Sequence, residues 1–271
     1  MKKWRYYILI LIVTVVMLAA PVFALYWTNE TVYSSGDVSG STSLEVDGSG
    51  NPGISFFDNT NKNLKYAHLM GAAWEIRTAD SADEVGFYNS LALDGVGKPH
   101  ISYFDGSEGG DLKYAHWTGS AWEISTVDSE GNLGFYNSMA LDGLDNPHIS
   151  YINSSNGDLM YAHWTGTTWA ISSVDSAGEV GFYNSLALDG FGNPHISYIN
   201  SSNGDLMCAH WTGTAWEIST VDSSTGNALL TSLALDGSGN PYISYVDGGN
   251  GYLKYAYGTE YPILTVTPNL T

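Results

Sequence analysis

Residues 91–95 read Leu-Ala-Leu-Asp-Gly, and this tract recurs along the chain with small changes. The aspartates of its five copies are 47, 48, 47 and 47 residues apart. A period of this length is typical of stacked supersecondary units, each too small to bury its own apolar face. The copies end at Gly48, Gly95, Gly143, Gly190 and Gly237, and tryptophans keep the same interval at Trp27, Trp74, Trp122, Trp169 and Trp216.

The second unit shows what each repeat contains. Four short segments, 90–94, 100–104, 112–117 and 122–127, have period-two or apolar patterns bounded by turn residues, and each predicts a strand. No sustained helical period follows the N-terminal stretch. The sequence therefore predicts an all-β fold, a five-bladed β-propeller of four-stranded antiparallel blades.

The chain ends suggest how strands group into blades. A Trp-type strand is predicted at 27–32, before the first complete unit, whereas the last unit stops after 253–257 without one. Pairing the N-terminal strand with the last three strands would close the ring and leave no open sheet edge. Leu-Ala-Leu-Asp would then line the channel, with the Trp-type strand outermost. The alternative grouping, with Trp innermost and no closure, stays open.

The N-terminal stretch predicts export. Lys2, Lys3 and Arg5 precede an apolar run, and small residues surround Ala24, which is typical of a secretory signal peptide over residues 1–24. An uncleaved anchor is the alternative. The propeller is expected over 25–258, and 259–271 is expected to be a linker or the start of a truncated further domain. We expect an extracellular or cell-surface protein.

Composition limits the possible partners. The formal net charge is −19 and becomes −22 if the N-terminal segment is removed. An acidic surface disfavours nucleic acid, and membrane contact is expected only if the N-terminal segment stays uncleaved. The single cysteine, Cys208, stands where other units have tyrosine, so no intramolecular disulfide is expected.

The five-unit pattern resembles the tachylectin-2-like lectins in period and strand count over residues 27–257. Those lectins bind N-acetylated sugars between their blades, so the resemblance implies sugar binding. The repeat wording, as in Ser90-Leu-Ala-Leu-Asp-Gly-Val-Gly-Lys-Pro-His-Ile-Ser-Tyr103, resembles uncharacterised secreted repeat proteins near the sialidase propellers. The Asp-box Ser-x-Asp-x-Gly-x-Thr-Trp is absent from this sequence, and Arg77 is its only arginine after Arg5. Sialidase chemistry is therefore not expected.

All seven histidines fall on two positions of the repeat. Three of them combine with an aspartate and a second histidine in sets of the kind that bind divalent metals. The fifth unit has Tyr242 and Tyr257 instead, and tyrosine replaces histidine better in packing and hydrogen bonding than in metal binding. We therefore expect a structural role and no metal or other cofactor. The sets are Asp94/His100/His116, Asp142/His148/His163 and Asp189/His195/His210.

Aromatic and amide residues recur at the opposite face. An aromatic ring beside an amide suits a neutral sugar, although the rings could instead fill space between blades while asparagine caps a turn. The predicted ligand-binding residues are Tyr88, Asn89, Tyr136, Asn137, Tyr183 and Asn184.

These observations favour a non-catalytic binding or adhesion module, with a glycan or cell-surface component as partner. The sequence contains no nucleophile elbow, phosphate loop or zinc-hydrolase motif. Two alternatives stay open: a propeller glycoside hydrolase or lyase, and a structural surface repeat without a small ligand. Sequons at Asn153 and Asn200 would place glycans on the tyrosine face, which would favour the opposite, Trp-rich face for binding.

Overall fold

The structure is a computed structural model that describes residues 27–82, 84–107, 109–224 and 226–259. The chain divides into two compact units at Thr31/Val32, and the second unit carries every strand described here. Among these described residues, no helix has the length and apolarity needed to span a membrane.

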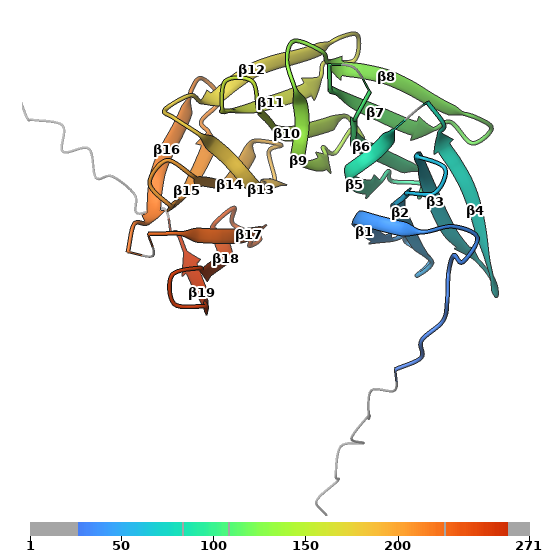
Figure 1. The fold of residues 1–271 in the computed structure, drawn as a ribbon. Helices are drawn as coiled ribbons and strands as arrows, with labels where there is room; N and C mark the ends of the chain where they lie inside the picture. Colours follow the sequence, from blue (N-terminus) through green and yellow to red (C-terminus); the bar gives the residue numbers. More distant parts are fainter. Residues whose placement is uncertain (1–26, 83, 108, 225, 260–271) are drawn as a thin grey trace, which may run out of the picture. The chain divides into compact units, whose positions relative to one another are not determined.

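Nineteen strands form five antiparallel sheets, which confirms the predicted all-β class (Figure 1). Each of the first four sheets has four strands in chain order, and the fifth has three. The strands are β1 (Val38–Val46), β2 (Pro52–Asp58), β3 (Asn63–Met70), β4 (Ala73–Asp80), β5 (Val85–Leu93), β6 (Pro99–Asp105), β7 (Asp111–Trp117), β8 (Trp122–Asp128), β9 (Leu133–Leu141), β10 (Pro147–Asn153), β11 (Asp158–Trp164), β12 (Trp169–Asp175), β13 (Val180–Leu188), β14 (Pro194–Asn200), β15 (Asp205–Trp211), β16 (Trp216–Asp222), β17 (Ala228–Leu235), β18 (Pro241–Asp247) and β19 (Tyr252–Tyr257).

The strand predicted at residues 27–32 is not formed, and the fifth sheet lacks the fourth strand that it was expected to supply. Trp27 is 85% exposed. Asn29 stands where β8, β12 and β16 have isoleucine, and asparagine is a poor strand former. The predicted signal segment and the residues after Thr259 lie outside the described residues.

The first strand of each sheet is innermost, as predicted. β1, β5, β9, β13 and β17 pack against one another in chain order, whereas the Trp-type strands are the outer edges (Figure 1). Neighbouring sheets share apolar cores. Leu112 and Tyr114 of one blade, for example, pack with Leu133, Met139 and Ile149 of the next. Each blade therefore buries its faces only by contacting its neighbours.

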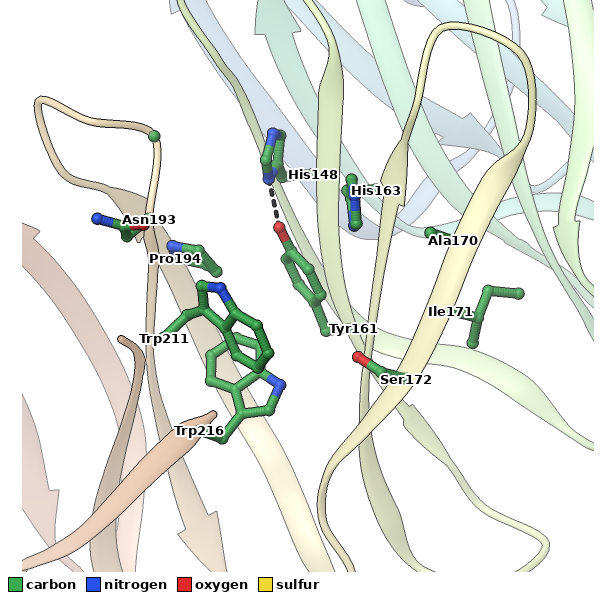
Figure 2. A pocket seen from close by; sticks show the side chains of 11 residues that line it. His148, Tyr161, His163, Ala170, Ile171, Ser172, Asn193, Pro194, Trp211 and Trp216 are labelled. Carbon is green, nitrogen blue, oxygen red and sulfur yellow. Dashed lines mark hydrogen bonds between the residues drawn. The ribbon is translucent and has the colours of Figure 1, made fainter. Parts of the chain in front are cut away.

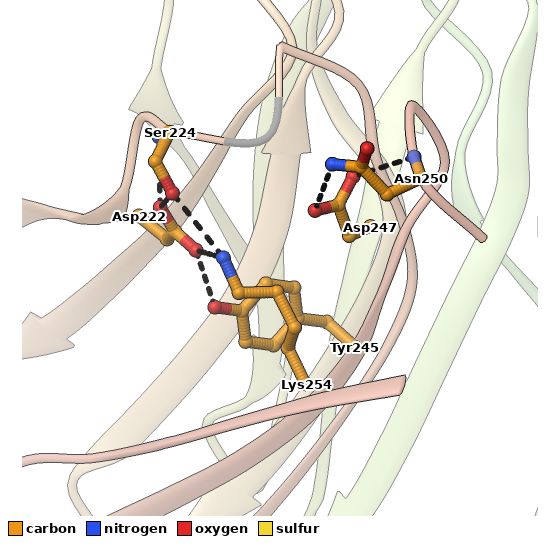
Figure 3. A network of polar contacts seen from close by, with 6 residues as sticks. All are labelled: Asp222, Ser224, Tyr245, Asp247, Asn250 and Lys254. Carbon is orange, nitrogen blue, oxygen red and sulfur yellow. Dashed lines mark hydrogen bonds and ion pairs between the residues drawn. The ribbon is translucent and has the colours of Figure 1, made fainter. Parts of the chain in front are cut away.

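A tyrosine–aspartate hydrogen bond joins each blade to the one before it. Tyr151 donates to Asp128 at 2.6 Å, and Tyr103, Tyr198 and Tyr245 make the same bond to Asp80, Asp175 and Asp222. Between the last two blades, Lys254 Nζ also lies 2.5 Å from Asp222 Oδ2 (Figure 3). Burial opposes ionisation of Asp222, but hydrogen bonds from Lys254 and Ser224 outweigh it and lower the pKa of this carboxyl.

The inner strands begin earlier than predicted. β5 starts at Val85 rather than near Ser90 because the preceding Gly-Phe-Tyr-Asn tract joins the sheet through a break in register. Tyr88 has φ +49°, in the left-handed region, and Gly86 has φ +109°. A Cβ atom on Gly86 would lie 2.9 Å from Leu64 of the preceding blade, so glycine permits both the backbone bend and the close approach.

Candidate functional site

The six ligand-binding residues predicted from the sequence converge on a single pocket. Three consecutive blades each contribute one tyrosine and one asparagine to a cavity of about 260 Å³. The tyrosine rings lie side by side and tilted to one another, with centroids 5.1 Å apart for Tyr88 and Tyr136 and 4.8 Å apart for Tyr136 and Tyr183. From the sequence, each of the three tyrosine–asparagine pairs belongs to a different blade. The inner strands bring the three blades together at one place, which we call the central pocket.

The asparagines of the central pocket are bonded within the protein. Asn137 Oδ1 accepts from Ser102 Oγ at 2.5 Å, and its Nδ2 donates to the carbonyls of Tyr88 and Gly134. Asn89 and Asn184 repeat this pattern with their own neighbours. These amides fix the backbone of the blade joints, which leaves the tyrosine rings as the groups available to a ligand.

The tyrosine hydroxyls of the central pocket interact with one another. Partial burial, followed by the charges and hydrogen bonds of Tyr183 and Tyr88, raises the pKa of Tyr136 to about 12. The Tyr136 hydroxyl therefore stays protonated and neutral at ordinary pH. The pocket offers aromatic edges and hydroxyl groups, but no charge.

A second kind of pocket lies between neighbouring blades, on the histidine-bearing side of the sheets. The pocket between blades three and four encloses about 500 Å³, and Figure 2 shows Trp211 and Trp216 across it from His163 and Tyr161. The pocket between blades two and three, of about 380 Å³, has the corresponding residues Trp164, Trp169, His116 and Tyr114. We call these the inter-blade pockets.

Aromatic packing builds the inter-blade pockets. In blades two, three and four the two tryptophans that flank the Thr-Gly turn pack edge to face, with centroids 5.5 Å apart for Trp211 and Trp216. The second tryptophan also meets the tyrosine of the preceding blade, at 5.3 Å for Tyr161 and Trp216. The tryptophans are half-buried, so each pocket keeps part of an indole face open.

Unpaired polar atoms gather at these same repeat positions. Seven buried side-chain nitrogen or oxygen atoms in the described part of the chain have no hydrogen-bond partner in the protein. An unpaired buried donor costs about 1–3 kcal/mol, so a repeated one needs an explanation. The atoms are Tyr66 Oη, His68 Nε2, His116 Nδ1, His163 Nδ1, Trp122 Nε1, Trp169 Nε1 and Trp216 Nε1.

Each inter-blade pocket therefore holds a matched pair of such atoms. His116 Nδ1 and Trp169 Nε1 belong to the pocket between blades two and three, and His163 Nδ1 and Trp216 Nε1 to the next. The indole N–H can only donate, whereas a neutral imidazole nitrogen can donate or accept. A ligand hydroxyl both donates and accepts, so it can pair with either group once the side chains that cover these buried atoms move aside.

The other histidine of each pocket is held by tyrosine. His100 Nδ1 lies 2.5 Å from Tyr114 Oη, and His148 Nδ1 is bonded to Tyr161 Oη. Burial raises the pKa of both tyrosines, so the phenol donates and the imidazole accepts. Burial also lowers the pKa of His100 to about 4, with His116 adding to the effect. This imidazole is therefore neutral at physiological pH, with its proton on Nε2.

The pockets differ in charge. Glu123 and Asp145 line the pocket between blades two and three. The corresponding residues of the pocket between blades three and four are Ala170 and Gly192. Glu123 lies 3.4 Å from His116. Between blades one and two, Arg77 stacks on Trp117 at 4.4 Å and covers the ring that a ligand would use. The pocket between blades three and four is thus the least charged of these sites.

The aspartate and histidine sets form no metal centre among the described residues. No group of three histidine, cysteine or acidic side chains is close enough there to hold an ion. His100 and His116 instead stack at 5.6 Å, and Tyr242 and Tyr257 of the fifth blade stack at 6.3 Å. These side chains therefore pack against one another as aromatic pairs.

The inter-blade pockets were not predicted from the sequence, although their tryptophans and histidines stand at recurring positions of the repeat. One signal pointed to them. Cys208 replaces the pocket tyrosine in blade four, and the fifth unit lacks the tryptophan that would cover it. Tyrosine and tryptophan are thus lost together at one joint, as expected if they pack across it.

Solved structures match this chain in fold. A triple arginine-to-alanine mutant of AofleA from Arthrobotrys oligospora is 11% identical with a TM-score of 0.59, covering 86% of this chain and 73% of that one. Aleuria aurantia lectin, in complex with Fucalpha1-6GlcNAc, is 12% identical with a TM-score of 0.54, covering 80% and 77%. An ulvan lyase from a new polysaccharide lyase family is 14% identical with a TM-score of 0.52, covering 80% and 69%.

No known family model and no curated protein matches the sequence. At these identities, the likeness to solved structures shows the fold alone, a multi-bladed β-propeller. The resemblance to tachylectin-2-like lectins stays a prediction.

Proposed function

We propose that this protein is a non-catalytic glycan-binding module, secreted or displayed at a cell surface, and that its sugars bind in the inter-blade pockets. The observation that carries the proposal is the recurring pair of unpaired buried groups, an indole N–H and an imidazole nitrogen, beside an open indole face. A sugar offers a hydroxyl for the polar pair and a C–H face for the ring. Pockets of about 380 and 500 Å³ suit one or two sugar residues.

Charge favours neutral sugars. The pocket between blades three and four has no acidic lining residue, whereas Glu123 and Asp145 in the preceding pocket would repel uronates and sialic acids. The overall net charge of −19 adds to this repulsion. Two similar pockets on one chain favour ligands that repeat the same sugar, because linked sites reinforce weak binding.

The similar structures support this reading in a general way. One is a lectin solved with a fucosylated disaccharide and another is a polysaccharide lyase, so the fold accommodates carbohydrate in other proteins. The residues argued here come from this chain alone.

The first test is a glycan screen of the purified protein, repeated on variants. His163→Phe keeps an aromatic ring but removes both ring nitrogens, and it should weaken binding about five- to tenfold, equivalent to about 1 kcal/mol for one hydrogen bond. Trp211→Ala removes the platform and should weaken binding at least as much. The matched control is Glu123→Ala, which copies Ala170 of the next blade and should retain neutral-sugar binding.

The central pocket is the second proposed site, because three tyrosines are held there in left-handed backbone conformations, with φ between 49° and 51°. Unusual backbone geometry tends to gather at functional sites. The triple change of Tyr88, Tyr136 and Tyr183 to phenylalanine removes the hydroxyls and keeps the rings. Loss of glycan binding in this variant, with normal binding by His163→Phe, would move the site to the central pocket.

A polysaccharide lyase is the alternative that a specific observation favours. Each pocket pairs a histidine with a tyrosine, groups that can abstract and donate protons. The raised pKa of Tyr114 makes it a poor base, however, and His100 is already bonded to it. Incubating the protein with polyuronates and following unsaturated product by its ultraviolet absorbance decides this point. Product formation would replace the binding-module proposal.

A further inference from the structure

The first and last blades expose apolar side chains at positions where the other blades bury them. Leu253 and Tyr255 on β19 are 81% and 61% exposed, whereas the corresponding Leu112 and Tyr114 on β7 are 0% and 7% exposed. These residues form the open face of the fifth blade. The neighbouring Tyr257, 65% exposed, extends it.

The first blade also has an open face, which is formed by residues of its inner strand β1. Val38 and Leu44 on β1 are 40% and 57% exposed, whereas the corresponding Val85 and Leu91 on β5 are 0% and 3% exposed. Val85 and Leu91 owe their burial to the preceding blade, whose Leu64 and Tyr66 share a core with them. The open face of the first blade is thus the surface that a preceding blade covers elsewhere in the chain.

The two open faces are the two halves of one joint. In the first three internal joints, the leucine and tyrosine of one blade meet the inner-strand apolar residues of the next, and in the fourth joint Cys208 replaces the tyrosine. Leu253 and Tyr255 supply the first half, and Val38 and Leu44 the second. The repeat itself therefore identifies the surface that fits each open face.

We infer that the open face of the fifth blade binds the open face of the first blade of a second copy, so that copies associate head to tail. Contacts between unlike surfaces of identical chains continue from copy to copy unless the rotation closes a ring. Exposed apolar side chains that lie together mark interaction surfaces. Among the described residues, β19 is also the last strand of its sheet, so its outer edge presents unpaired backbone groups.

The joint between copies lacks one bond of the internal joints. The first blade has Phe56 where the other blades have the tyrosine that bonds to the preceding blade, and Tyr33 packs on Phe56 at 5.1 Å. Association therefore relies on apolar contact and is expected to be weaker than the internal joints. It should depend on protein concentration in the purified protein.

Sedimentation equilibrium of the full protein across a wide concentration range tests this inference, and the proposal does not depend on sugar binding. We expect reversible association of the unmodified protein. Leu44→Asp and Leu253→Asp each place a charge on one open face at an exposed position, so each variant should fold normally, with unchanged circular dichroism, and stay monomeric. An equimolar mixture of the two variants should form a one-to-one dimer, because each retains the face that the other lacks.

Other results would overturn the inference. Association of either variant alone would show that like faces meet, and failure of the mixture to associate would exclude the head-to-tail joint. If the unmodified protein stays monomeric, a Leu44→Cys/Tyr255→Cys variant distinguishes the cause. A disulfide formed within single chains would show that the two open faces meet in the same molecule, which would replace the second copy with ring closure.

Discussion

At the scale of single residues, several buried polar groups of the described chain have no hydrogen-bond partner in the protein, which lowers its stability. His163 Nδ1 and Trp216 Nε1 are buried without a protein partner, while neighbouring Tyr161 and His148 bond to each other. Phenylalanine in place of either residue would avoid the cost of an unpaired group. Their recurrence in two adjacent pockets is best explained by a ligand that completes the hydrogen bonds.

The buried histidines make stability depend on pH. Burial lowers the pKa of His100 to about 4 and also lowers the pKa of His148, whereas an unfolded histidine has a pKa of about 6.5. Between these values the unfolded chain binds more protons, so the free energy of unfolding should fall as pH drops from about 6.5 to 4. His100 should contribute on the order of 3 kcal/mol across this window.

Urea unfolding at several pH values measures this dependence. His100→Tyr, which copies Tyr242 of the fifth blade, should flatten the slope between pH 6.5 and 4. Aspartates with a lowered pKa, such as Asp142, lose their contribution only at more acidic pH and act as an internal control. An unchanged slope in His100→Tyr would refute the assignment of this window to His100.

At the scale of elements, the inner strands of blades two, three and four each depend on one glycine, at Gly86, Gly134 and Gly181. Gly134 has φ +86°, and a Cβ atom there would lie 3.2 Å from Leu112 Cδ1 of the preceding blade. The following Tyr136 is also left-handed, and Asn184 of the next blade binds its carbonyl. One tract therefore bends the strand, brings two blades together and positions the central-pocket tyrosine.

Gly134→Ala should destabilise the protein by about 1–3 kcal/mol, because alanine is strained at positive φ and its methyl group would press on Leu112. Gly143→Ala is the matched control, since no atom lies within 4 Å of a Cβ there and the backbone is not left-handed. Urea midpoints of the two variants give the comparison. Equal midpoints would show that the close approach to Leu112 carries no energetic weight.

Strand identity was predictable because turn residues and the 47-residue period mark each element. The convergence of Tyr88, Tyr136 and Tyr183 on one pocket could not be predicted from the sequence, because it depends on how inner strands of different blades pack. The inter-blade pockets were missed for the same reason: His163 and Trp216 belong to different repeats, and a pattern within one repeat does not show that they meet. The strand expected at residues 27–32 followed from symmetry alone, without regard to Asn29.

At the scale of the whole molecule, the repeat produces similar pockets and one incomplete joint. The pockets differ through single substitutions, such as Glu123 against Ala170, so neighbouring sites can differ in preference while the framework stays constant. Head-to-tail association would add further pockets to one assembly and strengthen binding to repeating glycans. The acidic surface limits unselective attraction to other polyanions.

The most direct test of glycan binding in the inter-blade pockets is the indole N–H region of the nitrogen-15 correlation spectrum during titration with the best binder from the glycan screen. Trp169 and Trp216 carry unpaired buried indole groups in the pockets, and Trp27, 85% exposed, serves as the reference. We predict that the Nε1–H signals of Trp169 and Trp216 shift as their donors gain a hydroxyl partner, while that of Trp27 stays fixed. Saturation with glycan and no movement of either signal would contradict the account.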